Sequence, residues 1–334
     1  MRRSLLILSG IVVGASFALA TAASADYPER RIQLVYPWTP GTPTYAVSQI
    51  IADAMGEELG VQMPVVAKPG AGGVNAFMAA LNEPADGYTA LDGYVAPLII
   101  SPLFDKTEYT YESFIPLYSA TSNAFAIATR ADENRFTDFP SFIEYLKAHP
   151  GETRYTGGAD LALPHMVAAK VLQHYDAVSR PVPYGDLADG TKDLRGGVLD
   201  WMVVNPGIYR SNTDHLRIIA VLSELPEVVE IYDGAQRVED YGMELGLTGL
   251  APMGWNWWLV KEGTPDDVVA TLRDAMGKAL ERPEVREKIL QIGFVPTGYT
   301  PDQYTEVARS INEQLQSATD AITWEKDAIK ALDN

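Results

Sequence analysis

Strand-like and helix-like segments alternate along this chain, and their order restricts the fold more than any other feature. IQLVY (32–36), PVVAK (64–68) and TALDG (89–93) are strand-like, and helical spacing separates them at 46–59 and 76–82. In the first helical segment, apolar residues three and four apart form one buried face. A strand–helix–strand–helix order predicts a largely parallel sheet covered by helices.

A second series follows. Its strand-like segments span 125–130, 154–158, 181–184, 201–204 and 216–223. Its helical segments fall near 141–148, at 164–175 and in the residues up to Arg195. After a long extended segment at 246–265, helical patterns span 265–280, 283–292 and 301–318. We therefore expect two α/β lobes, with crossovers near 119–126 and within 220–260 and a cleft between the lobes.

Residues 1–25 have the layout of a secretory signal peptide. Arg2 and Arg3 form a basic head, an uncharged apolar run spans 5–20, and small residues at 23–25 precede Asp26. An N-terminal membrane anchor is the alternative, and the small residues just after the apolar run argue against it. We expect cleavage after Ala25 and a freely diffusing periplasmic protein, since no later segment approaches the roughly 20 apolar residues of a membrane span.

Charge and cysteine content restrict the partners. The formal net charge is −18, which disfavours nucleic acid and anionic membranes as partners. An anionic ligand remains compatible with it, because backbone dipoles dominate inside a closed cleft. The chain has no cysteine, so the core alone must stabilise an exported protein.

Motifs of the common enzyme classes are absent. The sequence has no G-x-S-x-G, no thiol nucleophile, no phosphate-binding Walker pattern and no H-E-x-x-H. The segment KPGAGGVNAF (68–77) resembles a dinucleotide-binding loop, but Asn75 stands where the third glycine should be. We interpret it as a strand-to-helix turn, with a loop lining the cleft as the alternative. We therefore expect no catalytic residue, no metal and no cofactor.

Several stretches occur together in an order typical of one family. They are YPERRIQLVYPWTPG, KPGAGGVNA, ADGYTALDG, YTGGADLALPH, PVPYGDLADGTKDLRGGVLD and EGTPDDVVATLRDAMGKALERPEVREKILQIGFVP. Over nearly the whole chain after residue 25, this order resembles the Bug-type substrate-binding receptors of tripartite tricarboxylate transporters. The resemblance implies a monomeric, type II-like, two-lobed periplasmic binding protein. It would bind a small carboxylate between its lobes and deliver it to large and small permease subunits in the membrane.

With this resemblance, the chain divides into four parts. Residues 1–25 are the signal peptide, 26–122 form the first lobe and 123–244 form the second. Residues 245–334 contain the second crossover and the C-terminal helices, part of which returns to the first lobe.

The family's first ligand loop corresponds here to Pro37–Tyr45. Gly41 is kept and the loop still leads into a helix N-terminus, whose amides can receive an acceptor group. Tyr45 stands at the position of the family's aspartate, and Thr42 replaces a glycine. These substitutions remove a charge and add an aromatic wall and a hydroxyl group.

The second loop corresponds to residues 157–165. Ala162 stands at the family's serine, while Asp160 adds a carboxylate. Both departures argue against a simple dicarboxylate as ligand. His165 opens a helix, where it can donate to a ligand or cap the loop.

Aromatic residues near the cleft favour a ligand with an apolar body. Trp255 and Trp257 share one face of an extended segment, and Trp258 takes the other, where we expect it to pack in the core. We also expect Asp92 and Asp200 to be structural. The predicted ligand-binding residues are Trp38, Thr39, Gly41, Thr42, Thr44, Tyr45, Tyr94, Gly158, Ala159, Asp160, His165, Asn205 and Trp255.

Two other functions stay open at this point. An exported enzyme would use Asp160 and His165 as an acid–base pair, although no nucleophile accompanies them. A receptor that serves a signalling partner would share the fold and the cleft.

Overall fold

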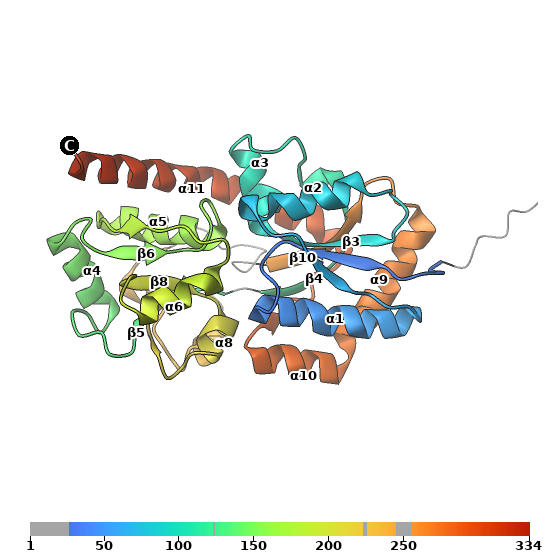
Figure 1. Ribbon diagram of the computed structural model, residues 1–334, viewed down its shortest axis with the longest axis horizontal. Coiled ribbons are helices and arrows are strands. Elements are labelled where there is room, and N and C mark those ends of the chain that lie inside the picture. Colours follow the sequence, from blue (N-terminus) through green and yellow to red (C-terminus); the bar gives the residue numbers. More distant parts are fainter. Residues whose placement is uncertain (1–26, 123, 223–225, 245–254) are drawn as a thin grey trace, which may run out of the picture.

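The computed structural model describes residues 27–122, 124–222, 226–244 and 255–334, which form two β-sheets with their helices. Figure 1 shows the sheets in two lobes: the first and last thirds of the chain share lobe 1, and the middle third forms lobe 2. The predicted signal peptide lies outside the described residues. The predicted lobe boundaries fall beside residues that are also outside them, and stay predictions.

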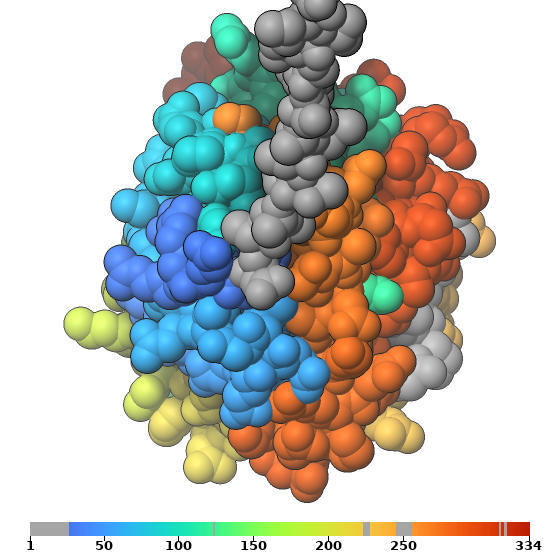
Figure 2. Space-filling model, turned by 90° about the vertical axis from the view of Figure 1, so that its right-hand side faces the viewer, coloured from blue at the N-terminus to red at the C-terminus, as the bar shows by residue number. Residues whose placement is uncertain are grey.

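Lobe 1 is built on a six-stranded sheet with strand order β11-β4-β10-β3-β1-β2. The strands are β1 (Gln33–Tyr36), β2 (Val65–Ala67), β3 (Thr89–Tyr94), β4 (Phe114–Ser122), β10 (Trp255–Lys261) and β11 (Val295–Pro296). The helices are α1 (Pro43–Leu59), α2 (Val74–Asn82), α3 (Ser101–Leu103), α9 (Asp266–Glu281) and α10 (Pro283–Ile292). Figure 2 shows the face where α1 lies beside α9 and α10, so segments from the first and last thirds of the chain pack together.

Lobe 2 is built on a five-stranded sheet with strand order β7-β6-β8-β5-β9. The strands are β5 (Ala126–Arg130), β6 (Arg154–Thr156), β7 (Arg180–Pro181), β8 (Trp201–Val204) and β9 (Leu216–Val221). The helices are α4 (Phe139–Ala148), α5 (Leu163–Tyr175), α6 (Gly190–Arg195), α7 (Pro206–Arg210) and α8 (Pro226–Ile231).

The two-lobed α/β architecture is confirmed, but both sheets are mixed rather than mainly parallel. Strand β1 pairs in parallel with β2 and β3, and β6 does so with β7 and β8. The strands next to the crossovers run the other way: β10 is antiparallel to β3 and β4, and β5 is antiparallel to β8 and β9. The prediction of parallel sheets followed from the repeated strand–helix order. That order does not show that β5 and β10, which follow the crossovers, run in the opposite direction.

Helix α1 shows how the local sequence sets an element that borders the cleft. Thr42 is its N-cap and accepts a hydrogen bond from the Tyr45 backbone N–H at 3.3 Å, and Pro43 occupies the first turn. At the other end, Gly60 adopts a left-handed conformation (φ 68°), which glycine tolerates best.

The C-terminal helix α11 (Tyr304–Leu332) is longer than the predicted 301–318 and extends over both lobes. At its start, the Tyr304 hydroxyl donates to the Tyr111 carbonyl in lobe 1 at 2.8 Å. Its last part packs on α5 in lobe 2, and just beyond it Asp333 pairs with Arg180 at 2.6 Å. Contacts with both lobes explain why the helix continues past the predicted end.

Trp257 and Trp258 are fully buried and belong to different core clusters, on opposite faces of β10. This agrees with the alternation predicted for an extended segment.

Within the described ranges, no helix has the length and hydropathy that a membrane span requires.

Asp92 on β3 is fully buried and holds four elements together. Its carboxylate accepts hydrogen bonds from the Ser48 hydroxyl of α1 at 2.6 Å and from the Asn256 amide of β10 at 2.7 Å. The Asn256 carbonyl in turn accepts from the N–H and the hydroxyl of Thr121 on β4, at 3.1 and 3.0 Å. The network therefore joins the strands that lead out of lobe 1 and back into it.

Burial raises the pKa of Asp92 to about 6, against the opposing hydrogen bonds from Ser48 and Asn256. The folded protein then holds this proton more tightly than the unfolded chain. The stabilisation that results is complete below about pH 4 and is lost as the pH rises to about 6.

We predict that Asp92→Asn stabilises the protein at neutral pH. Asparagine keeps both contacts, since its carbonyl accepts from Asn256 and its amide donates to the Ser48 hydroxyl. The gain over wild type should reach about 1 to 3 kcal/mol above pH 7 and shrink toward zero near pH 4. Urea unfolding across this pH range measures it, with exposed Asp53→Asn as control. An advantage that does not vary with pH would contradict the assignment.

Candidate functional site

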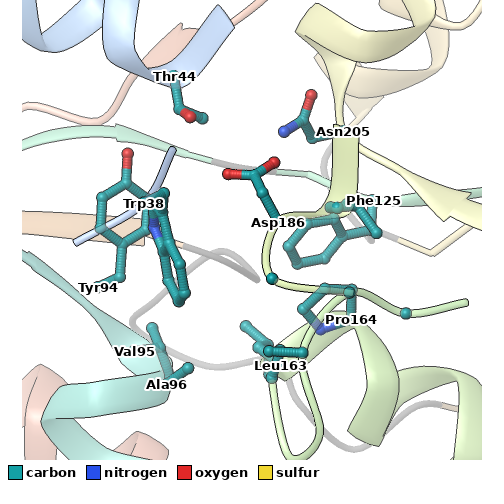
Figure 3. A pocket seen from close by; sticks show the side chains of 16 residues that line it. Trp38, Thr44, Tyr94, Val95, Ala96, Phe125, Leu163, Pro164, Asp186 and Asn205 are labelled. Atoms are coloured by element: carbon teal, nitrogen blue, oxygen red, sulfur yellow. The ribbon is translucent and has the colours of Figure 1, made fainter. Parts of the chain in front are cut away.

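A cavity lies between the two lobes, with an empty volume of about 590 Å³ including its mouth. Lobe 1 lines it with Trp38, Thr44, Tyr94, Val95 and Ala96. Lobe 2 lines it with Phe125, Gly157, Gly158, Ala159, Ala162, Leu163, Pro164, Gly185, Asp186, Leu187 and Asn205. Figure 3 shows the aromatic side chains of Trp38 and Tyr94 on one side of the space and Phe125 on the other.

The loop from β1 to α1 contributes Trp38 and Thr44 to this cavity. The indole of Trp38 meets the ring of Tyr94 edge to face, with centroids 5.6 Å apart. The Thr44 hydroxyl lies 2.6 Å from the Tyr36 hydroxyl and 3.2 Å from that of Thr42, so local hydrogen bonds fix its rotamer. The start of the loop thus supplies an aromatic wall, and its end supplies a hydroxyl group.

Other predicted residues of this loop point elsewhere. The Tyr45 hydroxyl donates to the Val65 carbonyl at 3.2 Å and its ring packs on Tyr36, so it supports the loop from outside the cavity. Gly41 and Thr42 line a neighbouring groove. Thr39 does not line the cavity, although its backbone N–H acts to lower the pKa of Asp186.

In the second loop, Gly158 and Ala159 line the cavity, whereas Asp160 and His165 do not. Asp160 is half exposed, and its carboxylate lies 3.7 Å from His165 Nδ1. Gly157 has no room for a side chain, because a Cβ would stand 2.4 Å from the His165 Cα. This part of the loop therefore lines the cavity with backbone atoms rather than with long side chains.

His165 is buried and faces α11 instead of the cavity. Its Nδ1 accepts from the Leu161 N–H at 3.2 Å, which leaves the proton on Nε2, 2.9 Å from Glu325. Glu325 is 2% exposed and also accepts from the Tyr155 hydroxyl. This network ties the second loop to the C-terminal helix, and an acid–base pair of Asp160 and His165 would lie outside the cavity.

Asn205, at the end of β8, lines the cavity beside the aromatic residues. Its Oδ1 accepts from the Ile208 N–H at 2.9 Å and caps α7, so its amide N–H groups are the part that remains to donate. Trp255 opens β10, and its side chain lies outside the described part of the structure. Its predicted ligand contact stays a prediction.

The lining residues absent from the predicted set are Val95, Ala96, Phe125, Gly157, Ala162, Leu163, Pro164, Gly185, Leu187 and one charged residue, Asp186. Asp186 is 9% exposed, and its Oδ1 accepts from the Ala188 N–H at 2.8 Å at the start of the short helix η4 (Leu187–Asp189). Burial raises the pKa of Asp186 to about 6, although the N–H groups of Ala188 and Thr39 act in the opposite direction.

A signal for Asp186 existed in the sequence. Strands β6 and β7 pair in parallel, so the loops after them emerge at the same edge of the sheet. Ligands of open α/β sheets bind outside such carboxyl ends. The segment that contains Asp186 (181–190, PVPYGDLADG) must therefore lie beside the Gly157–Gly158 loop. This position could have been inferred once β6 and β7 were recognised as neighbours.

Comparisons with known proteins agree with this geometry. Residues 47–324 match the model of a family described as "Tripartite tricarboxylate transporter family receptor". The chain belongs to that family. This confirms the resemblance found in the sequence, and the family is one of binding receptors rather than enzymes.

Individual relatives cover almost the whole chain. Protein BugT of Bordetella pertussis is 27% identical, over 90% of this chain and 91% of its own. A solved structure titled as that of a periplasmic transporter is 28% identical, has a TM-score of 0.75 and aligns over 89% of this chain and 97% of its own. R. palustris Rpa4515, solved with adipate, shares the fold at 20% identity with a TM-score of 0.79, over 89% and 98% of the two chains.

We predict that Glu325→Ala destabilises the protein by about 2 to 4 kcal/mol, because it leaves the His165 and Tyr155 donors buried without an acceptor. Glu325→Gln should cost less, since it keeps one acceptor in place. Exposed Glu313→Ala on the same helix, which removes only a surface ion pair with Arg309, should stay within about 0.5 kcal/mol. Guanidinium unfolding compares the three. Equal effects of Glu325→Ala and Glu313→Ala would show that the buried network adds no stability.

Proposed function

We propose that this chain is a periplasmic receptor that binds a small organic acid with an apolar or aromatic body and delivers it to the large and small permease subunits of a tripartite transporter. The observation that supports this most is the cavity lined from both lobes, because a ligand held there contacts both and stabilises their closed arrangement. Membership in the receptor family supports the same class of function.

The lining favours a ligand that is apolar along most of its length. Trp38, Tyr94, Phe125, Leu163 and Pro164 surround the space, and its described polar side chains are few. Micromolar binding needs about 8 kcal/mol. Apolar burial at roughly 25 cal/mol per Å² can supply much of this, whereas helix-terminus electrostatics add only about 0.3 to 2 kcal/mol.

We assign the ligand site to Trp38, Thr44, Tyr94, Gly158, Ala159 and Asn205 among the residues predicted from sequence. We leave Tyr45 and His165 out, since the first bonds to Val65 and the second to Glu325. Mechanistically, we infer that the lobes rotate about the β4 and β10 crossovers and that the closed form is the one that docks on the permease.

The first test is a thermal-shift screen of residues 26–334 with aliphatic mono-, di- and tricarboxylates, aromatic acids, amino acids and neutral aromatics. A ligand at 100 times its Kd adds about 2.7 kcal/mol, which raises Tm by a few degrees in a protein of this size. A stabilising acid supports the proposal. Absence of any stabilising compound in all classes would reject it.

We predict that Trp38→Ala weakens binding of the stabilising acid about ten-fold or more in Kd, because the indole forms one wall of the cavity. Trp324→Ala is the matched control, since this partly buried tryptophan on α11 lies outside the cavity lining. Isothermal titration calorimetry measures both. An unchanged Kd in Trp38→Ala would place the ligand elsewhere.

Uptake of the identified acid tests the delivery step. Cells lacking the gene should take up the labelled acid more slowly, and the intact gene should restore the rate. Normal uptake without the receptor would favour a signalling partner instead.

A further inference from the structure

Asp186 gives the cavity a negative charge that nothing in the described lining balances. Figure 3 shows its carboxylate pointing into the space between Trp38, Thr44 and Asn205. The described lining contains no lysine, arginine or histidine. The nearest acidic neighbour, Asp189, accepts from the Asp186 backbone N–H at 3.2 Å and adds a like charge nearby.

Local capping does not use all of the acceptor capacity of this carboxylate. The Ala188 N–H provides one hydrogen bond at 2.8 Å, whereas a carboxylate offers about four acceptor positions. A serine or an asparagine would cap η4 as well without placing a charge in the cavity. The charge therefore matters for what enters the cavity rather than for the turn alone.

The surroundings of Asp186 match a cation better than an anion. Burial raises its pKa, which shows that the ionised form is poorly solvated there. A second carboxylate placed beside it would be repelled through a medium of low dielectric constant. An ammonium group would instead form a charge-assisted hydrogen bond, and the carboxylate points towards the side of the space where the rings of Trp38 and Tyr94 can receive a cation.

We propose that the ligand of this receptor carries a protonated amine that binds Asp186, in addition to an acid group and an apolar body. The ligand class is thus an amine-bearing monoacid, not a di- or tricarboxylate. The Asn205 amide, whose oxygen is occupied by the α7 cap, is the donor in the lining that suits the acid group. This inference rests on the proposed function, because it requires the interlobe cavity to be the ligand site.

The experiment compares probes that differ only in the group meant for Asp186. Adipate and 6-aminohexanoate share a chain and one carboxylate, and differ by a carboxylate or an ammonium at the other end. 3-Phenylpropionate and L-phenylalanine share an aromatic body and differ by an ammonium group. Calorimetry at pH 7 with residues 26–334 gives the Kd of each.

Two variants with the same change in charge separate position from net charge. Asp186→Asn keeps a cap for Ala188 and removes the charge from the cavity. Asp189→Asn removes an equal charge three residues further along the chain, at a residue that does not line the cavity. We expect the amine-bearing member of a pair to bind wild type at least about ten-fold more tightly. Asp186→Asn should raise the Kd of the amine-bearing probe on the order of 10- to 100-fold, and Asp189→Asn should change that Kd less than about three-fold.

Three outcomes are distinguishable. The expected pattern supports the inference. Equal or tighter binding of adipate or 3-phenylpropionate to wild type, unaffected by Asp186→Asn, overturns it and leaves the proposed receptor function intact. Binding of no probe, in a screen where every other class is also silent, rejects the proposed function and the inference with it. Circular dichroism checks that each variant is folded, and Asp186→Ser, which also caps η4, replaces Asp186→Asn if that variant unfolds.

Discussion

The carboxylate of Asp92 and the amide of Asn256 hydrogen-bond inside lobe 1, at the point where the chain leaves that lobe and returns to it. Because Asn256 also binds Thr121, the outgoing strand β4 and the returning strand β10 are fixed against each other and against β3. In the lobe rotation proposed above, this network anchors the two crossovers to lobe 1.

Helix α11 adds a second kind of connection between the lobes. It begins against Tyr111 in lobe 1, and its Glu325 is buried against His165 and Tyr155 in lobe 2. The loop that lines the cavity is thus held from behind by a helix that starts in the other lobe. In the proposed closure, α11 must either keep its contacts with both lobes or bend. This restricts the directions in which the lobes can move.

Sequence reasoning recovered the parts of the fold that depend on local patterns. Strand–helix alternation predicted the lobes, and the Thr42 cap follows from the residues beside it. It failed where partners are distant. The role of His165 depends on Glu325, 160 residues away, and nothing near His165 in the sequence indicates that partner. Asp186 became a candidate only when β6 and β7 proved to be neighbours, and the direction of β10 is set by its crossover rather than by its own residues.

The arrangement of lobe 1 also bears on how the chain folds. Lobe 2 builds its sheet from five consecutive strands, β5 to β9, whereas lobe 1 inserts β10 between β3 and β4. The contact of Asn256 with Asp92 spans 164 residues, so a large loop must close before the lobe 1 sheet is continuous. Until then β3 and β4 have open edges, which are the positions where a partly folded chain pairs with another copy. The lobe 1 sheet is therefore complete only after the C-terminal third has joined it. A chain truncated before β10 would leave β3 and β4 with open edges and would also lose α11, which packs on α5 in lobe 2.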